Sequence, residues 1–138
     1  FVTMSLASLD IQAQSLTYSS AGHPSGYVMD SSGEVKSVME STRIPLGIMA
    51  DWKGQPPQNI PLERGDILVF LTDGILESLA ADGTSFGVEN TLELIRENRR
   101  KPARQILDHL LEGVHISLMG ARQEDDMTAV ICKMGEAS

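Results

Sequence analysis

The apolar residues near the start of the chain recur at every second position. Val2, Met4 and Leu6 alternate with small or polar residues, and the alternation returns at 16–20 after a polar stretch at 10–15. A period of two is typical of a strand that buries one face. The pattern therefore predicts a β-hairpin over residues 1–20.

Two more short segments of strand length follow, the apolar run at 27–29 and the sequence Glu-Val-Lys-Ser-Val at 34–38. Between them the sequence Asp-Ser-Ser-Gly at 30–33 has the composition of a four-residue turn. The segment Ala-Gly-His-Pro at 21–24 interrupts the alternation, because glycine frees the backbone and proline disfavours helix in the residue before it. We therefore expect the first third of the chain to form an antiparallel meander.

The middle of the chain changes character at residue 41. Four of the six prolines fall between 41 and 61, so this stretch is expected to run irregularly over the surface. Residues 67–71 are then a continuous apolar run of strand length. Such a run predicts a strand that is covered on both faces.

Apolar residues at helical spacing predict two helices in the last third. They recur at i, i+4 and i+7 from Val88, and a longer apolar stripe runs from 103 to 118. We expect the second helix to have Pro102 in its first turn and to end at Gly120. A final strand over 127–132 is expected to be central in its sheet.

The composition fits one acidic domain. A length of 138 residues suits a single core, and a net charge of -8 excludes the concentrated basic face that nucleic acids or anionic membranes require. The one basic run, 99–101, is interpreted as a solvated turn. No apolar stretch approaches the ~18 residues of a membrane helix, so membrane insertion is not expected. Cys132 is the only cysteine, which fits the reducing cytoplasm.

Acidic residues lie at the ends of the two most apolar strands. Asp73 follows the run at 67–71, and Asp125 and Asp126 precede the run at 127–132. If these strands are antiparallel neighbours, the acids meet on one rim of the sheet. Clustered carboxylates suit Mg2+ or Mn2+, which prefer oxygen ligands. An ordinary Asp-Gly turn and a solvated acidic pair are the alternative interpretations.

Five short motifs follow one another along the chain: Ala21-Gly22-His23-Pro24, Pro45-Leu46-Gly47, the run Leu-Thr-Asp-Gly-Ile-Leu-Glu at 71–77, Phe86-Gly87, and Asp125-Asp126-Met127-Thr128. In this order and spacing they resemble the metal-dependent type 2C (PPM) protein serine/threonine phosphatases. The similarity covers nearly the whole chain. It is greatest to the bacterial branch of stage II sporulation protein E and the sigma-factor-regulation phosphatases.

The resemblance implies an α+β fold, an antiparallel β-sandwich flanked by helices with a two-metal centre at one end. It implies that Asp73 and Asp125 are ligands of Mn2+ or Mg2+. A structural turn residue is the alternative interpretation of His23, and a helix-start acid that of Glu77. The residues that the resemblance places beside the metals or on the substrate side are Asp126, Gly74, His23, Gly22 and Glu77.

The activity implied by the resemblance is hydrolysis of phosphoserine or phosphothreonine by a metal-activated water, without a phosphorylated enzyme intermediate. The implied substrate is a phosphorylated regulatory protein, in relatives an anti-sigma-factor antagonist. Two other interpretations stay open: a non-catalytic pseudophosphatase that binds proteins in signalling, and a structural β-domain with an accessory helical pair. The acids at both strand ends favour the enzyme.

The first residues indicate where the resemblance is incomplete. The chain begins inside a strand pattern, and the family's first metal motif, an Asp shortly before a His-Gly pair, does not occur. We therefore expect residues 1–138 to be the C-terminal part of a single phosphatase domain, truncated before its N-terminal strands and first metal motif. Such a fragment is expected to be inactive alone and to self-associate through an exposed sheet edge.

Overall fold

The computed structural model describes residues 1–51 and 53–135, and it has the expected α+β architecture. Its elements in chain order are β1 (Met4–Asp10), β2 (Ser15–Ala21), β3 (Gly26–Met29), β4 (Val35–Met39), β5 (Gln58–Pro61), β6 (Ile67–Leu71), α1 (Asp73–Leu76), α2 (Gly87–Asn98), α3 (Ala103–Leu118) and β7 (Ala129–Lys133).

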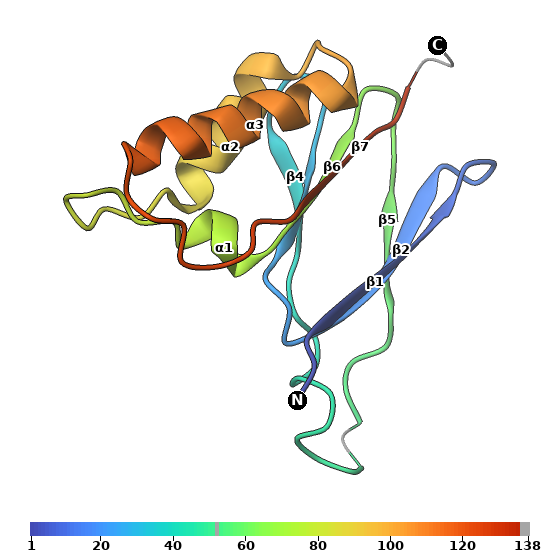
Figure 1. The fold of residues 1–138 in the computed structure, drawn as a ribbon. Coiled ribbons are helices and arrows are strands. Elements are labelled where there is room, and N and C mark those ends of the chain that lie inside the picture. Colours follow the sequence, from blue (N-terminus) through green and yellow to red (C-terminus); the bar gives the residue numbers. More distant parts are fainter. Residues whose placement is uncertain (52, 136–138) are drawn as a thin grey trace.

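The strands form two antiparallel sheets that face each other (Figure 1). One sheet has the strand order β1-β2-β5 and the other β4-β3-β6-β7. A buried apolar cluster draws side chains from both sheets, which makes the arrangement a β-sandwich. Its members are Leu16, Tyr18, Val28, Met39, Ile60, Leu62 and Leu68.

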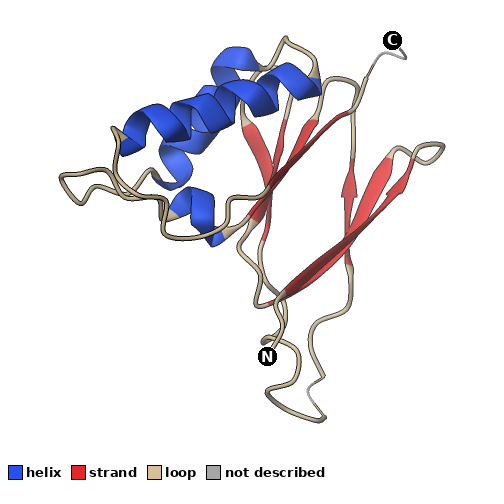
Figure 2. Cartoon of the chain, viewed as in Figure 1, coloured by secondary structure: helices blue, strands red, loops and turns tan. Residues whose placement is uncertain are grey.

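Helices α2 and α3 cover the outer face of the four-stranded sheet (Figure 2). A second buried cluster joins Met29, Ile67 and Val69 of the sheet to Ile95 and Ile106 of the helices. Side chains alternate along a strand, so β6 directs one set of residues to this cluster and the other set to the sandwich core. The prediction that this strand is covered on both faces is confirmed.

Both predicted helices are present, with small differences at the ends of α3. Pro102 is the N-cap with ψ 151°, so its backbone is extended and the helix begins one residue later than predicted. The helix ends at Leu118, and Met119 and Gly120 then take positive φ angles of 45° and 84°. Within the described ranges, no helix combines the length and apolar character needed to cross a bilayer.

The prediction of a single meander in the first third is wrong. Strand β2 pairs with β1 and β5, whereas β3 pairs with β4 and β6, so the chain changes sheets between Ala21 and Gly26. Gly22 makes this turn with φ +62°, a conformation that favours glycine. The stretch expected to be irregular contains β5, because Ile60 packs into the sandwich core and pairs with Leu16.

The last strand, expected to be central, and the first strand, expected to bury its Met4 and Leu6 face, both lie at sheet edges among the described residues. Strand β7 pairs only with β6, and its Val130 is 48% exposed, so the expected central position is wrong. In β1, Met4 and Leu6 are also exposed. The register pairs Ala7 with Tyr18, which gives the inward face to odd-numbered residues and turns Met4 and Leu6 away from the core.

The helix-covered core generates a prediction on stability. Ile106 is 1% exposed and Ile116, on the same helix, is 66% exposed. We expect Ile106→Ala to lower the free energy of unfolding by about 2–5 kcal/mol, because it leaves a cavity. The control Ile116→Ala is expected to change it by less than about 0.5 kcal/mol. Urea unfolding measures both, and equal losses would contradict the assignment of this core.

Candidate metal-binding site

The pairing of β6 with β7 brings the predicted acids to one rim of the sheet. Leu71, the last residue of β6, pairs with Ala129, the first residue of β7. Asp73 therefore lies just beyond one end of this ladder, and Asp125 lies in the segment that leads into it. The expected convergence of the two acids is a direct result of the antiparallel register.

Two threonines continue the ladder beyond the strands. The Thr72 N–H donates to the Thr128 carbonyl at 3.0 Å, and the Thr128 N–H donates to Thr72 Oγ1 at 3.0 Å. Thr72 is also the N-cap of the short helix α1, which begins at Asp73. The backbone that carries Asp73 is thus tied to the segment that follows Asp126.

Gly74 allows these two segments to touch. A Cβ placed at Gly74 would lie 2.1 Å from the Asp126 carbonyl oxygen, which is far inside contact distance. The Gly74 carbonyl in turn accepts a hydrogen bond of 2.6 Å from the buried Ser78 hydroxyl. Glycine is required at position 74 because the Asp126 backbone lies so close, and not because the residue has a positive φ.

Hydrogen bonds also shape the loop that carries Asp125. The Asp126 N–H donates to Asp125 Oδ1 at 2.7 Å, and the Gln123 side-chain amide donates to the Asp125 carbonyl at 2.7 Å. These bonds fix the Asp125 carboxylate relative to its own backbone. The side chains of Asp73 and Asp125 are both exposed, so they are accessible to ligands from solvent.

A pocket of about 580 Å³ contains both acids. One side is formed by Asp73, Gly74 and Glu77 of the α1 segment. The opposite side is formed by the loop after α3, with Arg122, Glu124 and Asp125. Four carboxylates and one guanidinium therefore line the same hollow.

A small hairpin forms the rim of this pocket. Leu79 bridges to Ser85, and both residues line the hollow. At the hairpin tip the Thr84 N–H donates to Asp82 Oδ1 at 2.9 Å. This bond and the Thr84 hydroxyl stabilise the charged form, so they hold the pKa of Asp82 below its ordinary value.

The donor set in the pocket fits part of a site for a hard divalent cation. Carboxylate oxygens with water are the ligands that Mg2+ and Mn2+ prefer. In residues 1–51 and 53–135, however, no group of three or more Asp, Glu, His or Cys side chains has the geometry to bind a metal. Asp73 and Asp125 place two carboxylates in this pocket, and a complete metal site would require further ligands from water or from other residues.

The structure does not bring His23 and Gly22 into this pocket. His23 Nδ1 lies 3.3 Å from Thr3 Oγ1, and neither residue lines the hollow. A Cβ at Gly22 would lie 2.3 Å from Pro45 Cγ, and the Gly22 N–H donates to the Arg43 carbonyl at 2.9 Å. The motifs at 21–24 and 45–47 are thus in contact, and this contact holds the irregular segment after β4 against the end of β2.

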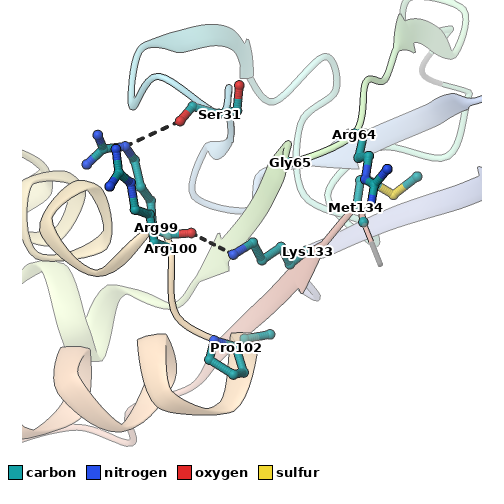
Figure 3. A pocket seen from close by; sticks show the side chains of 10 residues that line it. Ser31, Arg64, Gly65, Arg99, Arg100, Pro102, Lys133 and Met134 are labelled. Atoms are coloured by element: carbon teal, nitrogen blue, oxygen red, sulfur yellow. Dashed lines mark hydrogen bonds between the residues drawn. The ribbon is translucent and has the colours of Figure 1, made fainter. Parts of the chain in front are cut away.

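A second hollow, of about 600 Å³, has the opposite charge (Figure 3). Lys133 lies in it at the far end of β7 from Asp125, and its Nζ donates to the Arg99 and Lys101 carbonyls at 2.7 and 3.0 Å. Arg99 Nε donates to the Ser31 carbonyl at 3.3 Å. Lys133 thus satisfies two carbonyls in the turn after α2, and Arg99 satisfies one in the turn between β3 and β4. The hollow is therefore no candidate for a cation.

No sequence pattern indicated Arg122 or the rim hairpin as parts of the site. Arg122 is one charged residue in a polar loop, and the hairpin forms a single bridge between Leu79 and Ser85. Thr72 and Thr128, which extend the ladder, are part of the sequence motifs that contain Asp73 and Asp125. Their role becomes visible only from the strand register.

Two solved structures with this fold are phosphatase domains. The PP2C domain of SiaA from Pseudomonas aeruginosa matches 96% of the chain with a TM-score of 0.83 at 22% identity, and the match spans 51% of that domain. The PP2C domain of SpoIIE from Bacillus subtilis matches 96% with a TM-score of 0.79 at 23% identity, over 37% of that chain. The fold is therefore that of the metal-dependent type 2C phosphatase class.

The family model of stage II sporulation protein E matches residues 1–135, and the chain belongs to this family. Its sequence is 26% identical over 134 residues to the phosphoserine phosphatase RsbU of Bacillus subtilis. The aligned region covers 96% of this chain and 39% of RsbU. It is 25% identical over 130 residues to the protein IcfG of Synechocystis, and spans 20% of that protein. The chain thus spans well under half the length of these relatives.

The contact at Gly74 generates a second prediction on stability. We expect Gly74→Ala to lower the free energy of unfolding by about 1–3 kcal/mol, because the new methyl group displaces the Asp126 backbone. A Cβ at Gly135 would meet no atom within 4 Å, so Gly135→Ala is the matched control and is expected to stay within about 0.5 kcal/mol. Chemical denaturation compares the two variants. An unchanged Gly74→Ala variant would show that the two segments are not in contact.

Proposed function

We propose that this chain supplies the Asp73 and Asp125 side of the metal centre in a protein serine/threonine phosphatase. The observation that carries the proposal is the shared pocket of these two acids at the end of the β6–β7 ladder. Membership of the stage II sporulation protein E family supports the reaction class. Asp126 and Gly74 are proposed to position the two ligands, since they connect the ligand-bearing segments.

Each part of the pocket has a chemical role in this proposal. Bound Mn2+ or Mg2+ supplies Lewis acidity toward the phosphoryl group and activates the attacking water. Asp73 and Asp125 bind the metals through their carboxylates, and Gln123 fixes the backbone at Asp125 through its bond to the carbonyl. Glu77 lies in the pocket wall, where its carboxylate is available to waters that complete the coordination.

The proposed substrate is a phosphoserine or phosphothreonine of a regulatory protein, such as an anti-sigma-factor antagonist. The name phosphoserine phosphatase, carried by the relative RsbU, supports the substrate class. The pocket is open and its acids are exposed, so a phosphorylated side chain on a protein surface can reach them. A pseudophosphatase module is the second candidate. The acids in one pocket favour catalysis, because protein binding alone does not require clustered like charges.

We also propose that the complete domain needs residues beyond these 138, and that they include the first metal motif. Three observations support this division. The chain matches about half of the SiaA phosphatase domain. The described residues provide no metal group of three or more ligands. The outward side chains of β1, Met4 and Leu6, are exposed on a face that no described helix covers (Figure 2).

The metal assignment generates a binding prediction. We expect Asp73→Asn and Asp125→Asn each to weaken Mn2+ binding by the full-length protein about tenfold or more, because a neutral amide replaces a charged ligand. The control is Asp108→Asn, which removes the same charge from an exposed acid on α3 that pairs with Arg104. Calorimetric titration with Mn2+ measures all three variants.

A loss of Mn2+ affinity in Asp108→Asn equal to that in the pocket variants would attribute the effect to net charge. Unchanged affinity in both pocket variants would remove the metal assignment itself. The pseudophosphatase alternative predicts a different result, in which the metal binds but a phosphoprotein substrate is not turned over.

The proposed division generates a prediction for the 138 residues alone. We expect this polypeptide to hydrolyse an aryl phosphate with Mn2+ far more slowly than the full-length protein, because ligands are missing. We also expect it to self-associate through the exposed β1 face and the β7 edge. Turnover equal to that of the full-length protein, or a clean monomer in sedimentation, would count against the respective half of this prediction.

A further inference from the structure

We propose that Arg122 binds the phosphoryl oxygens of the substrate in this pocket, an inference that rests on the proposed phosphatase function. Arg122 is the one basic side chain among the described residues that line the hollow with Asp73, Glu77, Glu124 and Asp125. It comes from the loop after α3, three residues before Asp125. The substrate-binding cation and a proposed metal ligand are thus carried by one short segment.

The Arg122 guanidinium is not used in the architecture of the described chain. Arg96 pairs with Glu93, Arg104 pairs with Asp108, and Arg99 donates to the Ser31 carbonyl. For Arg122, the described residues show neither an ion pair nor a side-chain hydrogen bond, although carboxylates share its pocket. Its five N–H donors therefore remain available to a ligand.

The backbone on both sides of Arg122 is nevertheless fixed. The Ala121 N–H donates to the Leu118 carbonyl at 2.8 Å, at the end of α3. On the other side, the Gln123 side-chain amide donates to the Asp125 backbone carbonyl at 2.7 Å. A side chain on a constrained loop, with no ion pair among the described residues, stays within reach of the pocket, so a bound phosphoryl group would need to order the side chain alone.

The electrostatics of the pocket explain why a cation is needed there. A phosphate monoester carries close to two negative charges at neutral pH, and four carboxylates on the walls repel it. The whole chain adds to this repulsion with a net charge of -8. A guanidinium matches the phosphoryl oxygens in geometry through two parallel N–H···O bonds. Among the described side chains that line the pocket, Arg122 is therefore the one that attracts a phosphoryl group by its charge.

A structural role for Arg122 predicts different behaviour. A basic residue just beyond the C-terminus of α3 interacts favourably with the helix dipole, and that effect requires only charge. In that case Arg122→Lys would be silent and Arg122→Ala would lower only thermal stability. Phosphate recognition requires the planar fork, so lysine would restore only part of the function.

The test is calorimetric binding of inorganic phosphate, the reaction product, to the full-length protein loaded with Mn2+. We expect Arg122→Ala to raise the dissociation constant of phosphate about tenfold, with Arg122→Lys in between. The matched control is Arg100→Ala, which removes an exposed arginine from the hollow at the other end of the sheet (Figure 3). This control is expected to leave phosphate binding unchanged.

Kinetics on a phosphoserine peptide provide the second readout. We expect Arg122→Ala to raise KM about tenfold with little change in kcat, while Mn2+ affinity stays at the wild-type value. Unchanged phosphate binding and KM with normal Mn2+ affinity would overturn the role of Arg122 alone. A wild-type protein that binds no Mn2+ would instead overturn the proposed function on which the inference rests.

Discussion

The antiparallel pairing of β6 with β7 is the constraint on which the rest of the structure depends. It joins segments that are far apart in the sequence, and hydrogen bonds between Thr72 and Thr128, which are 56 residues apart, extend it beyond the strands. The ladder is held in register because β6 is covered on both faces, by the helices and by the second sheet. A shift of one residue would exchange the two faces and expose apolar side chains. The burial of β6 therefore sets the position of the acids at its end.

The pairing separates a packed core from acidic side chains that are exposed to solvent at the end of the strands. The strand and helix faces that pack around β6 are apolar and buried, whereas Asp73 and Asp125 are exposed just beyond the ladder. The opposite end of β6 and β7 carries the basic hollow, whose Lys133 and Arg99 are engaged with backbone carbonyls (Figure 3). The four carboxylates of the pocket, Asp73 and Asp125 among them, thus lie at one end of the β6–β7 ladder, and the hollow with Lys133 and Arg99 lies at the other.

Much of this arrangement follows from the sequence, since burial imposes a period on it. The run at 67–71, the apolar stripe of α3 and the placement of Asp73 and Asp125 follow from strand and helix periodicity. The change of sheet at Gly22 cannot be predicted in this way, because the local pattern of β2 and β3 does not determine which sheet each strand joins. Strand β5 depends on Ile60 contacting the sandwich core, which is a tertiary effect. Met4 and Leu6 have the pattern of a buried face, but the described residues place nothing over them. The place of Arg122 in the pocket depends on how a polar loop folds back.

A crystal structure of the full-length protein grown with Mn2+ tests the central claim most directly. The anomalous signal of manganese locates the ions without reference to activity. The account predicts manganese in the pocket at the end of the β6–β7 ladder, with Asp73 and Asp125 oxygens within about 2.5 Å of the ions. Manganese bound elsewhere, or a filled site in which neither carboxylate is a ligand, would contradict it.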